Sequence, residues 1–70
     1  MNNTFTAVIK NENGWWIGWI EEILGVNCQE RTQKELMKSL SVALKEAIQL
    51  NKEEALRAAK SGYFEELVHV

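Results

Sequence analysis

The chain has 70 residues, of which 46% are hydrophobic and 26% charged, and its formal net charge is -2. This length fits one domain, and the composition is that of a globular protein rather than of a disordered or membrane protein. Nucleic-acid binders concentrate basic side chains on one face, whereas the eight Lys and Arg residues here are scattered along the chain. We therefore expect no direct nucleic-acid binding and no membrane role, while a mildly acidic module suits a basic protein partner.

The sequence contains one cysteine, Cys28, and one histidine, His69. A lone cysteine cannot form an internal disulfide, which favours a reducing, cytoplasmic location. The residues after Met1 form neither a basic n-region nor an apolar h-region, so we expect no signal peptide.

A metal site needs several ligands at fixed spacing. We therefore expect no metal and no cofactor, with Cys28 packed as a small apolar residue and His69 on the surface of a strand.

Two strands joined by a tight turn are expected at the beginning of the chain. Residues 4–10 alternate apolar and polar side chains, which is typical of a half-buried strand. Residues 11–14 (Asn-Glu-Asn-Gly) predict a turn, and Trp15–Ile20 (WWIGWI) predicts a second strand. The pair should form an antiparallel hairpin.

A third strand and a capped helix are expected next. Residues 21–25 connect to a short polar strand over residues 26–31. Thr32 and Glu35 have the T-x-x-E spacing of a capping box, in which the Thr side chain accepts one free N–H and the Glu side chain reaches back to another. The apolar residues that follow recur at helical spacing and form one stripe: Leu36, Leu40, Ala43, Leu44, Ala47 and Ile48.

The helix is expected to end near Leu50 or Asn51. Residues 52–60 then form either a second, shorter helix with Asn51 as its N-cap or an extension of the first. Ser61 and Gly62 end this helix, because Gly is a common C-cap. Residues 63–70 (YFEELVHV) predict a last strand.

The elements together predict one α+β domain over residues 1–70. Their order is β-β-β-α-(α)-β, with an antiparallel three-stranded sheet, a final strand, and a helix packed on one face of the sheet.

From Phe5 to about Leu50, this pattern resembles the N-terminal domain of the HicB family of antitoxins. The matching parts are the Asn-Gly turn, the aromatic second strand, the Glu21–Gly25 connection, the polar pair Gln29-Glu30, and the helix from Thr32 through Ala47. The sequence departs from the family pattern at Glu21 and Leu24, where the family has prolines, and at Leu36, where Ala or Glu is more typical.

The resemblance implies a partial RNase-H-like fold and an antitoxin function. A protein of this kind would neutralise a small, basic ribonuclease toxin of the HicA type by forming a complex with it. We expect no appended helix-turn-helix or ribbon-helix-helix DNA-binding domain, which puts autorepression in doubt.

The candidate binding residues lie on the tryptophan-rich strand. Neighbouring residues of a strand point to opposite faces of the sheet, and one helix covers only one face. Gly18 would let a helix approach closely, so we expect Trp16, Gly18 and Ile20 to face it. Trp15, Ile17 and Trp19 would then form an apolar patch for a partner, unless both faces are simply core.

Three acidic residues near the loop, Glu21, Glu22 and Glu30, are expected to form a cluster that steers a basic partner. The alternative is that they are solvated loop acids. The chain has no Asp and no acid on the residues expected to form the first two strands, so we expect no metal-assisted catalysis and no enzyme.

Two other functions are also compatible with the sequence. The first is a stand-alone homo-oligomeric scaffold or small-ligand-binding domain, because a domain of this size buries little surface by itself. The second is a ribbon-helix-helix DNA binder, in which residues 26–31 would be the reading strand. Homo-oligomer formation is expected under the antitoxin hypothesis as well.

Overall fold

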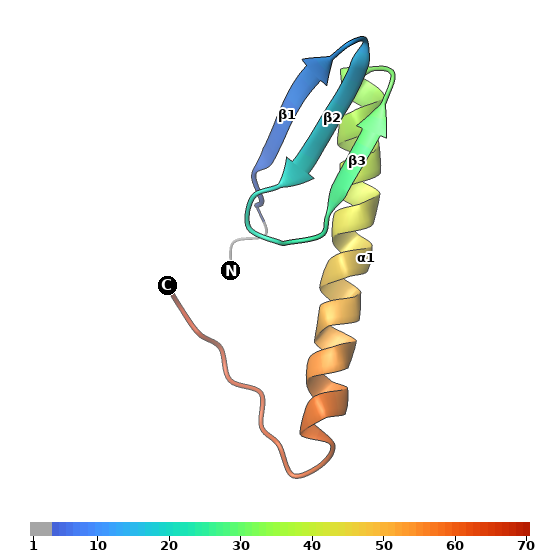
Figure 1. Ribbon diagram of the computed structural model, residues 1–70. Helices are drawn as coiled ribbons and strands as arrows, with labels where there is room; N and C mark the ends of the chain where they lie inside the picture. The colour runs from blue at the N-terminus through green and yellow to red at the C-terminus, as the bar shows by residue number, and fades with distance from the viewer. Residues whose placement is uncertain (1–3) are drawn as a thin grey trace.

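The computed structural model describes residues 4–70 and contains three strands followed by one long helix. These are β1 (Ala7–Glu12), β2 (Trp15–Ile20), β3 (Asn27–Glu30) and α1 (Gln33–Ala59). The strands form an antiparallel sheet in the order β1-β2-β3, and α1 lies against one side of it (Figure 1). The expected α+β class and the antiparallel three-stranded sheet are confirmed.

The turn between β1 and β2 consists of two residues, Asn13 and Gly14. Both have positive φ, 53° and 83°, as a type I′ turn requires, and its twist matches that of the flanking strands. β1 therefore continues to Glu12, which pairs with Trp15. The turn is shorter than the four residues expected, and it fixes which side chains of β2 share a face.

The helix begins with a cap on Thr32. The Thr32 hydroxyl accepts a hydrogen bond from the Glu35 N–H at 3.1 Å, which confirms its role as N-cap. The same hydroxyl donates to the Glu35 carboxylate at 2.9 Å. Glu35 thus bonds the Thr32 side chain and not, as expected, the Thr32 N–H, so this is half of a capping box.

α1 is continuous through Asn51, so the alternative of a second helix capped by Asn51 is wrong. No Gly or Pro lies between Gln33 and Ala59, and an interior Asn costs under about 1 kcal/mol, too little to break a helix. The Gln49 side chain also donates to Glu53 at 2.9 Å, an i,i+4 bond across the expected boundary. The helix ends at Ala59, and its C-cap is Lys60 with φ 64°, not Gly62.

Residues 61–70 form no strand, which corrects the expectation of a final strand. The last helical residue packed against the core is Ala47. Because α1 continues for twelve residues after it, the helix carries the chain about 18 Å past the sheet at 1.5 Å per residue. The segment leaves the helix there, reverses direction and runs back toward the sheet without pairing with a strand (Figure 1). His69 is therefore exposed on an irregular segment.

The core lies between β2, β3 and the first half of α1. Four residues of the described chain are buried hydrophobics: Ile20, Val26, Leu36 and Leu40. Gly18 is also buried, and it faces the helix. A Cβ atom built on Gly18 would lie 3.0 Å from Ile9 and 3.1 Å from both Leu36 and Leu40. The missing side chain therefore sets how closely the helix approaches the sheet.

Replacing Gly18 with valine should destabilise the fold. A side chain at this position has no room among three apolar neighbours, and overpacking of a core typically costs about 1–3 kcal/mol. Chemical denaturation of Gly18→Val should show this loss in the free energy of unfolding. Asn27→Val, an added valine at an exposed position of β3, is the control and should stay close to the parent. Equal stability of Gly18→Val and the parent would contradict the close approach.

Loss of the helix cap should have a smaller effect. Thr32→Ala removes the acceptor of the Glu35 N–H and should lower the free energy of unfolding by about 1 kcal/mol. Thr32→Ser keeps the hydroxyl and should retain most of that stability. If both variants had the same thermal midpoint, the hydroxyl would not be acting as the cap.

Candidate protein-binding surface

The side of the sheet opposite α1 carries the residues of each strand that point away from the core. Because Gly18 and Ile20 face the helix, alternation along β2 places Trp15, Ile17 and Trp19 on this second side. No element of residues 4–70 lies over it (Figure 1). We call it the open face; its members are Val8, Lys10, Glu12, Trp15, Ile17, Trp19, Asn27, Gln29 and Arg31.

The apolar part of the open face lies at the end of the sheet far from the turn. Trp19 pairs with Val8 on β1 and with Asn27 on β3, and Ile17 is the next open-face residue along β2. Trp19 is 40% exposed, while Val8 and Ile17 are half-buried. These three side chains form a patch in which Trp19 is the most exposed member.

Charged residues occupy the turn end of the same face. The Arg31 guanidinium lies 3.5 Å from the centroid of the Trp15 ring, a cation–π contact. Lys10 and Glu12 form an exposed ion pair at 3.5 Å. Trp15 is therefore partly covered by Arg31 and is less exposed than Trp19. Sequence reasoning did not include Arg31, although alternation on β3 places it on the same face as Gln29.

The three acidic residues are not brought together. Glu21 and Glu22 follow the end of β2, whereas Glu30 pairs with Trp16 near the turn, at the opposite end of the sheet. Glu30 also points to the helix side, where it accepts a hydrogen bond from the Ser39 hydroxyl at 2.6 Å. The expectation that Glu30 clusters with Glu21 and Glu22 is wrong. β2 and β3 are antiparallel, so Glu30 lies at the other end of the sheet although it is close in sequence. Glu30 links β3 to α1.

Glu22 has a structural role of its own. Its carboxylate accepts a hydrogen bond from the Thr6 N–H at 2.8 Å. The Glu21 N–H donates to the Thr6 carbonyl at 2.9 Å, so the two acids hold the start of β1 against the end of β2. The bond from the Thr6 N–H stabilises the charged carboxylate and lowers the pKa of Glu22. The Glu21 side chain is exposed and adds a negative charge just beyond the end of β2.

Cys28 lies on the helix side of β3, half-buried and packed against the core. Burial raises the pKa of its thiol, and the neighbouring Glu30 carboxylate adds to the effect. The thiol is therefore protonated at neutral pH, which suits packing rather than reactivity.

Residues 4–70 bring together no group of three or more His, Cys, Asp or Glu side chains that could hold a metal ion. Within the same residues, α1 lacks the long apolar stretch that a membrane-spanning helix requires.

Comparison with models of protein families, with curated proteins and with solved structures finds no match to this chain. The open face is thus characterised by its own geometry.

The pKa of Glu22 gives a test of the contact between β1 and β2. In an NMR titration, the Glu22 carboxyl should show a midpoint below the ordinary value of 4.5, and the Thr6 amide proton should shift with the same midpoint. A lowered pKa in the folded state means that the contact stabilises the fold above pH 4.5 and that this contribution is lost as the pH falls through the folded pKa.

The variant Glu22→Gln removes the charge and keeps an acceptor oxygen. Its deficit in the free energy of unfolding relative to the parent should be greatest near neutral pH and should shrink in acid. A midpoint at or above 4.5, or a deficit that does not depend on pH, would contradict the contact.

Proposed function

We propose that this protein is an antitoxin-like module that binds another protein through its open face. The observation that carries the proposal is the exposed Trp19 indole beside Val8 and Ile17, on a face that no described element covers. Trp is the residue type most enriched at the energetic centres of protein interfaces. An apolar patch with a polar surround is also the usual composition of such a surface.

The proposed partner is a small, basic ribonuclease toxin of the HicA type, neutralised by complex formation. Support for this partner comes from the resemblance to HicB antitoxins and from charge. The chain is acidic overall, with ten Glu against eight Lys and Arg. The exposed Glu21 lies just beyond Ile20, at the same end of the sheet as Trp19. A negative rim beside an apolar centre would attract and orient a basic protein.

In this proposal the chain binds the toxin and does not itself catalyse a reaction. The lone, protonated thiol of Cys28 fits a reducing compartment, so we place the protein in the cytoplasm. A ribbon-helix-helix DNA-binding function has little support, because a single helix follows β3 within residues 4–70, whereas that motif uses two.

The test is co-expression with a HicA-type ribonuclease encoded beside the gene. The parent chain should co-purify with the toxin and relieve its inhibition of growth. Trp19→Ser should weaken the affinity by about tenfold or more, since a central interface tryptophan contributes about 2 kcal/mol or more. Val42→Ser is the matched control, because Val42 is a 54% exposed apolar residue of α1 that lies away from the sheet.

A charge variant tests the acidic rim separately. Glu21→Lys should slow association with the toxin and reduce the effect of salt on the rate. If the parent forms no complex with the neighbouring protein and gives no relief of growth, the proposed function is wrong. If Trp19→Ser and Val42→Ser bind as the parent does, the open face is not the surface involved.

A further inference from the structure

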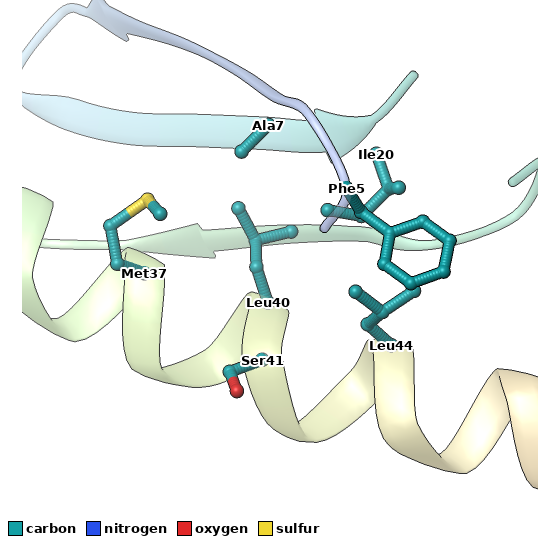
Figure 2. Close-up of a pocket in the computed structure, with 7 residues that line it drawn as sticks. All are labelled: Phe5, Ala7, Ile20, Met37, Leu40, Ser41 and Leu44. Atoms are coloured by element: carbon teal, nitrogen blue, oxygen red, sulfur yellow. The ribbon is translucent and has the colours of Figure 1, made fainter. Parts of the chain in front are cut away.

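The helix is not centred under the sheet. α1 packs mainly against β2 and β3, and the underside of β1 has less cover. An apolar groove of about 160 Å³ lies at this position, between β1 and α1. The lining is mostly apolar and comes from the residues just before β1, from β1, β2 and α1 (Figure 2). Its members are Phe5, Ala7, Ile20, Met37, Leu40 and Leu44, with Ser41 as the polar one.

The groove is small and apolar. Ligand-binding pockets commonly enclose about 300–1000 Å³, whereas a cavity of about 150 Å³ lined by apolar side chains accommodates one benzene ring. The groove therefore fits a single aromatic side chain better than a cofactor or metabolite. Next to it runs β1, an edge strand with one side unpaired within the described sheet. An edge of this kind can pair with an added strand.

Residues 61–70 have the properties of such a strand. Phe64 is 91% exposed, and the segment contains four other exposed large apolar side chains: Tyr63, Leu67, Val68 and Val70. β-branched and aromatic residues favour extended structure. In a strand, Phe64, Glu66, Val68 and Val70 would share one face, which is apolar apart from Glu66 and has Phe64 as its largest apolar member.

A single chain exposes more surface to solvent than a compact chain of the same mass does. The solvent-accessible surface is 6043 Å², against about 4500 Å² for a compact chain of the same mass, 8.1 kDa. The radius of gyration is 15.2 Å, compared with about 11 Å for a compact domain of this length. The excess of about 1500 Å² is nearly twice the roughly 800 Å² that each partner buries in a standard interface.

The charges of residues 61–70 also complement those on the side of α1 that borders the groove. Ser41 lines the groove, and Lys45 lies one helical turn after it on the same flank. Lys52 continues this line beyond the sheet. Residues 61–70 contain the two acids Glu65 and Glu66 and no Lys or Arg. A copy of this segment would therefore place the carboxylate of Glu66, which shares a strand face with Phe64, on the side of the exposed lysines.

From these observations we infer that two copies of the chain form a dimer by exchanging residues 61–70. The segment of one copy adds to the free edge of β1 in the other and inserts Phe64 into the groove between β1 and α1. Because groove and segment belong to the same chain, the exchange is reciprocal and closes with two-fold symmetry. This surface is distinct from the open face, so the dimer goes beyond the proposed function and does not depend on it.

The first experiment is sedimentation equilibrium on the full chain. The parent should have twice the chain mass. Phe64→Ser should raise the dimer dissociation constant at least about tenfold. Since Phe64 is almost fully exposed in the single chain, this substitution leaves the monomer fold intact, and circular dichroism should confirm that. Val42→Ser and Trp19→Ser should leave the dimer mass unchanged, which separates this surface from the one proposed to bind a toxin.

A second measurement identifies which chain supplies the segment. In a mixture of isotope-labelled and unlabelled chains, an isotope-filtered NOE experiment should detect contacts between the Phe64 ring and the Met37 methyl of different chains. A monomeric parent would overturn the inference. So would a Phe64–Met37 contact within one chain, or a dimer that lacks this contact and is unaffected by Phe64→Ser.

Discussion

The close packing of Gly18 against Leu36 and Leu40 is the contact on which the rest of the structure depends. It lets α1 approach the middle of β2 without an intervening side chain, and the buried residues Ile20, Val26, Leu36 and Leu40 gather around it. Once this side of β2 is committed to the helix, the alternation of side chains sends Trp15, Ile17 and Trp19 to the other side. The open face is therefore a direct consequence of where the helix packs.

The molecule has three distinct surfaces: the helix side of the sheet, the open face and the groove beside β1. The helix side of the sheet holds the core, together with Cys28 and the Glu30–Ser39 hydrogen bond. The open face combines an apolar end around Trp19 with a charged end around Arg31. The groove beside β1 results from the off-centre position of α1. With so small a core, binding at either exposed surface would add a substantial share of the total stability.

Local signals in the sequence predicted the elements that local interactions determine. Asn13-Gly14 and Thr32 act within a few residues of themselves, so a turn and a helix start could be placed from sequence alone. The end of α1 could not, because residues 49–59 have no strong breaker and continued helix there costs little. The acidic cluster failed for another reason: the distance between Glu22 and Glu30 depends on strand register and direction. The groove depends on the lateral position of the helix, which no periodicity encodes.

The length of α1 has a consequence for motion. Residues Gln33 to Ala47 are held by the sheet, whereas the remaining twelve residues are stabilised mainly by their own backbone hydrogen bonds and by a few side-chain pairs such as Gln49–Glu53. Short helices without tertiary packing are marginal in water. In the single chain, the far half of α1 therefore opens with a low free energy, and its amide protons exchange with solvent much faster than those around Leu40.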